Sequence, residues 1–79
     1  MSENTTLDQL KKGERAKITL VEDDAADMGT RLRELGFAED MRVELLQVGT
    51  LGDPLVVQVG SMRVALREND ARLIGIERI

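Results

Sequence analysis

Apolar and polar residues alternate along much of this chain, in short segments separated by turn-forming residues. Residues 14–21 show the pattern most regularly: Ala16, Ile18 and Leu20 lie on one face, and charged or polar residues occupy the other. A period of two over this length is typical of a half-buried β-strand. We therefore predict a strand here, with these three apolar side chains in the core.

Residues 42–48 and 73–79 are predicted to form two more strands. The alternation within 42–48 slips at Leu45-Leu46, where two apolar residues follow one another. Such a slip indicates a β-bulge or a strand that is buried on both faces. Residues 73–79 are expected to close the fold as a short final strand.

Between these two strands, residues 55–59 and 62–66 predict a β-hairpin. Their connection is Gly60-Ser61, and a glycine in the first position suits a type II′ turn. The inward-facing residues are predicted to be Leu55, Val57 and Val59 on the first strand and Met62, Val64 and Leu66 on the second.

One amphipathic helix is predicted over residues 25–35. Asp24 precedes it as an N-cap, and Gly36 follows it where helices often end in a left-handed residue. The apolar stripe of this helix consists of Ala25, Met28, Leu32 and Leu35. Only single turns are expected elsewhere, at residues 7–10 and 68–72.

Together these elements predict a mainly β fold, a small SH3-like barrel of about five short strands with one inserted α-helix. Residues 1–6 are polar and are expected to be a disordered tail, with residues 7–79 forming a single domain. A chain of 79 residues has room for one modest core. Phe37 is its only aromatic residue, so aliphatic side chains must fill most of that core.

The charge balance argues against nucleic acid as a ligand. Fifteen acidic and eleven basic residues give a net charge of −4, whereas nucleic-acid binding depends on clustered basic residues that neutralise phosphates. An anionic membrane surface demands a similar basic patch. The sequence has neither a signal peptide nor an apolar stretch long enough to cross a bilayer. We therefore expect no membrane insertion and a cytoplasmic location.

The sequence contains neither cysteine nor histidine. Disulfides, zinc fingers, iron–sulfur ligation and imidazole catalysis are therefore excluded within this chain. The carboxylates of Asp23, Asp24 and Asp27 fit the acidic start of a helix better than a metal site. Serine and threonine hydroxyls have no histidine to activate them. We expect no catalytic residues, no metal site and no cofactor, in a protein that is not an enzyme.

Three segments, in this order, resemble the FeoA family, the small cytosolic accessory proteins of bacterial ferrous iron transport. They are residues 31–37 (RLRELGF), residues 51–57 (LGDPLVV) and residues 64–74 (VALRENDARLI). One departure is Asp40, which occupies a turn position where the family often has glycine. Aspartate tolerates turn conformations, so the expected fold is unchanged.

The resemblance implies an SH3-like barrel with an inserted helix and a role in iron homeostasis that depends on protein–protein interaction. The implied partner is the FeoB-type ferrous iron transporter, a membrane protein with a cytosolic G-protein domain. This partner would recruit the chain to the inner face of the cell membrane. At the level of the family, the resemblance also implies an association with transition metal ions.

Two alternative functions stay open. The same fold occurs as the C-terminal domain of iron-dependent repressors, which suggests an SH3-like peptide-binding or metal-sensing regulatory module. A DNA-binding repressor would also need a helix-turn-helix, and this sequence contains none ahead of the barrel. Self-association is the other possibility.

Candidate partner-binding residues lie in three places. They are the helix end at Leu35, Gly36 and Phe37, the loop at Leu51, Gly52, Asp53 and Pro54, and the outward face of one strand at Arg63 and Arg67. Each has a structural alternative, because Gly36 is also a helix stop, Phe37 a core residue and the loop a good turn. Leu51 favours the functional interpretation, because an apolar residue at a loop tip is either tucked inward or offered to a partner.

Overall fold

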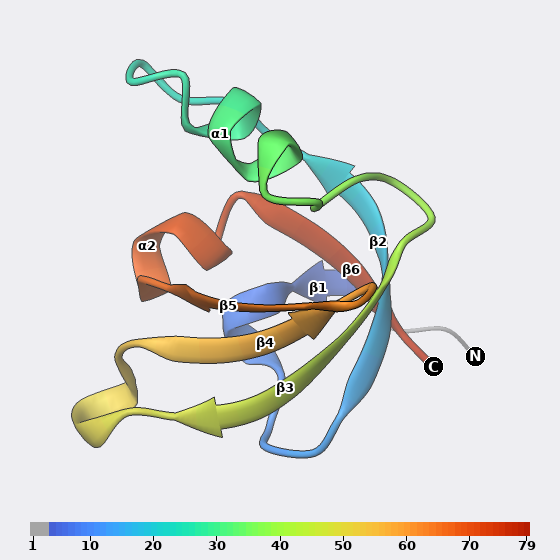
Figure 1. The fold of residues 1–79 in the computed structure, drawn as a ribbon, viewed down its shortest axis with the longest axis vertical. Coiled ribbons are helices and arrows are strands. Elements are labelled where there is room, and N and C mark those ends of the chain that lie inside the picture. The colour runs from blue at the N-terminus through green and yellow to red at the C-terminus, as the bar shows by residue number, and fades with distance from the viewer. Residues whose placement is uncertain (1–3) are drawn as a thin grey trace.

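The computed structural model describes residues 4–79 and is shown in Figure 1. These residues form one antiparallel sheet with the strand order β1-β6-β2-β3-β4-β5. The strands are β1 (Asn4–Thr6), β2 (Arg15–Val21), β3 (Arg42–Val48), β4 (Leu55–Val59), β5 (Met62–Leu66) and β6 (Ile74–Arg78). The helical segments are the α-helices α1 (Met28–Glu34) and α2 (Glu68–Ala71) and the 3₁₀ turns η1 (Leu7–Gln9) and η2 (Thr50–Gly52). The predicted mainly β class is confirmed.

The sheet curves around a single apolar core, and all buried side chains among residues 4–79 are apolar. Phe37 is the largest of the fully buried side chains. Leu55, Val57 and Val59 of β4 all point inward, as predicted. The remaining core residues are Leu7, Leu10, Ala16, Ile18, Val21, Leu32, Val43, Leu45, Leu66, Ala71, Ile74 and Ile76.

Asn4–Thr6 form strand β1, so the expectation of a disordered tail is wrong for these residues. They pair with β6, with Thr5 opposite Ile76. This pairing uses backbone groups, and the polar side chains of the segment therefore give no alternating pattern that could reveal it. The rest of the predicted tail, residues 1–3, lies outside the described residues.

The alternation in β2 does not continue to the end of the strand. Its pairing with β6 shifts between Ile18 and Leu20, which turns the following side chains around. Leu20 is 46% exposed, and Val21 is buried in its place. The prediction that Leu20 belongs to the core is therefore wrong.

In the second half of the chain, the predicted bulge and hairpin are both present. The pairing of β3 with β4 shifts between Leu45 and Gln47, which confirms the bulge. Gly60 has φ +56 in the two-residue turn, as a type II′ turn requires at this position. Met62, however, is half exposed rather than buried, because β5 is the last strand of the sheet order and Met62 lies at its very start.

Helix α1 begins at Met28, three residues later than predicted. The Asp24 carboxylate accepts hydrogen bonds from the N–H groups of Ala26 and Met28, at 2.9 and 3.0 Å, and thereby holds a turn before the helix. Gly29 is buried against the preceding strand end: a Cβ there would lie 2.6 Å from the carbonyl oxygen of Glu22. This close approach needs glycine and places α1 on the barrel.

The end of α1 has the predicted left-handed glycine. Gly36 has φ +107, its N–H donates to the Arg33 carbonyl, and the Phe37 N–H donates to the Leu32 carbonyl, both at 3.0 Å. These bonds satisfy the last carbonyl groups of the helix and turn the chain so that Phe37 enters the core.

Replacing Gly36 with valine is expected to destabilise the domain by about 1–2 kcal/mol, because a β-branched residue is disfavoured at positive φ. The backbone is the whole cause, since the nearest atom to a Cβ at this position is Val59 Cγ1 at 3.9 Å. Urea denaturation of Gly36→Val measures the effect. The control is Thr30→Val, which introduces the same residue at an exposed position in α1. Equal stabilities of the two variants contradict the prediction.

Candidate functional site

The loop between β3 and β4 is a tightly bonded turn. The Gly49 N–H donates to the Pro54 carbonyl at 2.8 Å, and the Gly52 N–H donates to the Gly49 carbonyl at 3.0 Å. The Asp53-Pro54 peptide bond is cis. A Cβ at Gly49 would lie only 2.4 Å from the Asp53 carbonyl oxygen, so the two arms of the loop touch. The loop therefore presents its tip in a fixed conformation.

Leu51 occupies this tip. Its side chain is 98% exposed, and the loop projects from the end of β3 and β4 in Figure 1. Its backbone has φ 64 and ψ 23, in the left-handed region. For leucine, this backbone conformation is about 1–2 kcal/mol less favourable than a right-handed or extended one. Because the side chain is exposed, no burial of apolar area offsets this cost. Such strain in an exposed loop is a feature that points to function.

Asp53 anchors the loop to α2. Its Oδ1 accepts a hydrogen bond from the N–H of Glu68, the first residue of α2, at 3.0 Å. This bond satisfies one of the free N–H groups at the helix start. The carboxylate therefore has an internal role, although the residue is exposed. Arg67 directly precedes Glu68 and is also exposed, so it lies beside the loop.

The predicted helix-end residues divide between the surface and the core. Leu35 is 37% exposed, whereas Phe37 is fully buried. Phe37 thus offers no surface to a partner, and its assignment as a contact residue is corrected to a core residue. Gly36 lies against Val59, at the end of β4 opposite the Leu51 loop. Figure 1 likewise shows α1 and this loop at opposite ends of the molecule.

Arg63 and Arg67, predicted to lie on one outward strand face, are at different ends of the hairpin. Arg63 lies within β5, opposite Gln58, whereas Arg67 lies beyond the end of that strand. Four residues of extended chain separate them by about 13 Å. The structure therefore groups Arg67 with the Leu51 loop and places Arg63 toward the other end of the hairpin.

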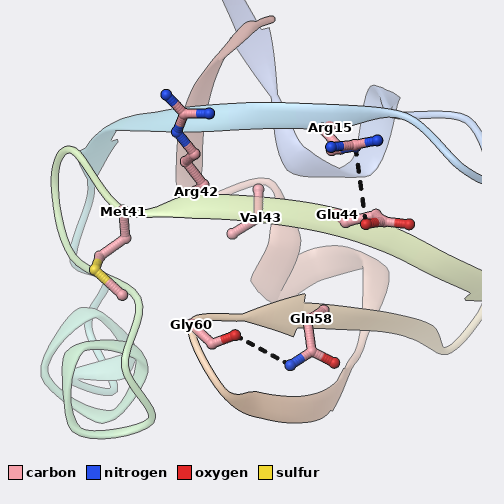
Figure 2. Close-up of a pocket in the computed structure, with 7 residues that line it drawn as sticks. All are labelled: Arg15, Met41, Arg42, Val43, Glu44, Gln58 and Gly60. Atoms are coloured by element: carbon pink, nitrogen blue, oxygen red, sulfur yellow. Dashed lines mark hydrogen bonds and ion pairs between the residues drawn. The ribbon is translucent and has the colours of Figure 1, made fainter.

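A second surface feature is a hollow on the outer side of β2, β3 and β4 (Figure 2). It measures about 270 Å³, slightly below the range of common small-molecule sites. Figure 2 shows Arg42 and Met41 toward one end of the hollow, and the ion pair of Arg15 with Glu44 at the other. Its other lining residues are Val43, Gln58 and Gly60. No sequence pattern predicted this feature, because it depends on which strands lie side by side.

Acidic residues are not gathered into a metal centre in the part of the chain that the structure describes: residues 4–79 contain no group of three or more aspartates and glutamates placed to hold an ion. Asp23 and Asp24 instead direct their carboxylates to backbone N–H groups around the start of α1. Asp27, predicted to lie in the first turn of the helix, instead precedes Met28 and makes no capping hydrogen bond through its side chain. No helix among the described residues is long and apolar enough to cross a membrane.

The sequence profile of the FeoA domain matches residues 5–78. The chain belongs to the FeoA family. This is a family of small SH3-like accessory domains associated with ferrous iron transport, and it is not a known enzyme family. The family recognition and the SH3-like fold predicted from the sequence are thereby confirmed.

Two solved FeoA structures are similar to this chain in both sequence and fold. FeoA from Stenotrophomonas maltophilia, solved in complex with zinc and described as an SH3 domain protein, is 39% identical, with a TM-score of 0.82 over 91% of this chain and 88% of that one. FeoA from Chlorobium tepidum is 32% identical, with a TM-score of 0.84 over 95% of this chain and 70% of that one.

A manganese-dependent transcriptional repressor shares the fold alone. It is 18% identical, with a TM-score of 0.87 over the whole of this chain and 44% of the repressor. The predicted structural likeness between FeoA proteins and part of such repressors is confirmed. No curated protein sequence matches this chain.

Proposed function

We propose that this protein is a non-enzymatic regulatory partner of ferrous iron transport that binds the cytosolic G-protein part of a FeoB-type transporter. Family membership supports the transport role. The S. maltophilia relative is itself described as a candidate activating factor of bacterial ferrous iron transport. In this proposal the protein is cytoplasmic and reaches the inner face of the cell membrane through the transporter.

The single observation that carries the proposal is the Leu51 loop. A fully exposed leucine held at positive φ is unfavourable in the isolated domain. Burying its side chain in a partner contributes about 1.5–3 kcal/mol. Because the loop is already fixed by Gly49, Pro54 and Asp53, little conformational entropy is lost on binding.

The docking surface that we propose consists of the loop and the residue beside it: Leu51, Gly52, Pro54 and Arg67. Asp53 holds this surface in shape through Glu68. Leu35, Gly36 and Arg63 lie away from it, and we assign them no part in this contact. The basic side chain of Arg67 adds a preference for an acidic group next to the apolar pocket that receives Leu51.

Binding to the purified cytosolic domain of the transporter from the same organism tests the proposal. We expect saturable one-to-one binding by calorimetry, measured separately with GDP, with a GTP analogue and without nucleotide. Absence of binding at protein concentrations up to about 100 μM in all three states, weaker than most specific complexes, contradicts the proposal.

The alternative, a metal-sensing or peptide-binding module like that of the repressors, has less support. The likeness to the manganese-dependent repressor is 18% identity and shows a common fold. Proteins with a common fold often have different functions, because function depends on the residues of a particular site and not on the fold. The Leu51 loop is the site that we propose, and it belongs to the segment in which this chain resembles FeoA proteins.

A further inference from the structure

The hollow on β2, β3 and β4 has an unusual arrangement of charges around Arg42. Directly opposite Arg42 on β2 is Lys17, so two cations face one another across the strands. Like charges in this position destabilise a sheet. On the other side of Arg42 lies the end of β4. The last residue of that strand, Val59, pairs with Val43, and the next residue, Gly60, has no side chain. Arg42 therefore has a cation on one side and open space on the other.

Three other arginines among residues 4–79, Arg15, Arg72 and Arg78, have acidic partners. Arg15 Nε lies 3.9 Å from Glu44 Oε1, and Arg72 Nη2 lies 2.6 Å from Glu68 Oε1. Within residues 4–79, no carboxylate lies within 4.0 Å of the Arg42 guanidinium, as is also true of Arg31, Arg33, Arg63 and Arg67, but Arg42 alone of these lines the hollow. Arg42 also borders a second hollow, which it shares with Lys17 and Glu77. Lys17 is itself paired with Glu77 of β6, so Arg42 has a cation on the neighbouring strand and a carboxylate one strand further away.

The open space beside Arg42 exists because residue 60 is glycine. A Cβ at Gly60 would lie 3.3 Å from Met41 Cε, so any side chain there would crowd Met41. Gln58 also lines the hollow, and its Nε2 donates to the Gly60 carbonyl at 3.1 Å. The result is a hollow with Arg42 and Met41 toward one end and the Arg15–Glu44 ion pair at the other (Figure 2).

We propose that this hollow is a second docking site, which receives an acidic segment of the protein partner. A carboxylate of that segment pairs with Arg42 and relieves its repulsion with Lys17, and a neighbouring apolar side chain contacts Met41. Arginine and methionine are enriched at protein interfaces, which fits this arrangement. The inference rests on the proposed function, because its partner is the cytosolic domain of the transporter.

The charges around the hollow favour a protein segment over a polyanion. Glu44 lines the hollow and Glu77 lines the adjacent one. Both repel the continuous negative charge of a nucleic acid or of an anionic membrane. The net charge of the whole chain, −4, adds to that repulsion. A single carboxylate next to an apolar group can instead lie at the end of the hollow that holds Arg42 and Met41, away from Glu44, which is paired with Arg15 at the other end (Figure 2).

The test compares Arg42→Glu with Arg31→Glu, which makes the same charge change at an exposed position on α1. We expect Arg42→Glu to weaken binding of the transporter's cytosolic domain at least tenfold and Arg31→Glu less than twofold. The melting midpoint of Arg42→Glu is expected to stay the same or rise, because glutamate opposite Lys17 is a favourable pair. Loss of binding is then separable from loss of fold.

Amide chemical shifts of the ¹⁵N-labelled protein locate the contact directly. On titration with the cytosolic domain, the signals of Arg42, Gln58 and Gly60 are expected to move in the wild type. Wild-type binding with unmoved signals, or with Arg42→Glu binding equally well, overturns this inference and leaves the proposed function standing. No binding by the wild type overturns both. Shifts of these signals with anionic lipid vesicles but not with the protein domain overturn the choice of a protein segment.

Discussion

Replacing Phe37 with alanine is expected to lower the free energy of unfolding by about 3–5 kcal/mol, the usual range for removing a large buried side chain. Phe37 is the largest fully buried side chain and enters the core directly after α1. Among the other core residues every side chain is aliphatic, so no neighbouring aromatic ring is available to fill the cavity. A domain of 79 residues has about 4–12 kcal/mol of stability in total, so this substitution is expected to remove a large share of it.

Urea denaturation with Leu35→Ala as the control makes this measurement specific. Leu35 lies two residues away at the same helix end but is 37% exposed, so its truncation is expected to change stability by less than about 1 kcal/mol. A Phe37→Ala variant no less stable than Leu35→Ala would mean that Phe37 is not a core residue. That outcome would restore it as a candidate contact residue.

Much of the fold could be predicted from the alternation of apolar residues. The hairpin at β4 and β5, the bulge in β3 and the helix stop at Gly36 each have a local cause, a period of two or a glycine in the right place. The errors have non-local causes. β1 is held by backbone pairing with β6, a strand some seventy residues away. The side chains of Asn4–Thr6 show no alternation of apolar and polar residues that would predict this strand.

The start of α1 illustrates a second limit of prediction from sequence. A stripe that includes Ala25 and Met28 is periodic enough for a helix. In the structure Asp24 uses its carboxylate to hold a turn, and Gly29 lies against the Glu22 carbonyl. Where a helix begins is thus decided by a contact with the preceding strand, which periodicity does not report.

The candidate site was predictable only as separate segments. The loop containing Leu51 stands out in the sequence because an apolar residue occurs among turn-forming ones. The positive φ of Leu51 and the link from Asp53 to Glu68 depend on tertiary structure. The Arg42 hollow could not be predicted from the sequence, because it depends on the pairing of Arg42 with Lys17 across two strands.

The largest functional effect is expected from Leu51→Glu. We expect this substitution to abolish transporter-dependent ferrous iron uptake in cells that lack the native copy, while the melting midpoint of the purified protein stays almost unchanged. The side chain is 98% exposed and contributes nothing to the core, so the fold does not depend on it. A glutamate at the tip places a charge where the proposed contact requires an apolar group, and burying an unpaired charge is strongly unfavourable.

Leu20→Glu, at a leucine that is 46% exposed on β2, is the matched control and is expected to support uptake.

Two further substitutions at the same position separate the side chain from the backbone. Leu51→Met keeps both the apolar area and the unfavourable positive φ, and is expected to support uptake. Leu51→Gly removes the side chain and relieves the strain, so we expect a melting midpoint that is unchanged or higher together with loss of uptake.

Normal uptake with both Leu51→Glu and Leu51→Gly would show that the loop is only a turn. Uptake lost with Leu51→Glu but kept with Leu51→Gly would mean that the partner lies close to the tip without binding the leucine. Loss with both, and retention with Leu51→Met, is the pattern that only an apolar anchor produces. Leu51→Glu and Leu51→Gly differ in charge and backbone strain but both lack an apolar side chain, whereas Leu51→Met keeps one.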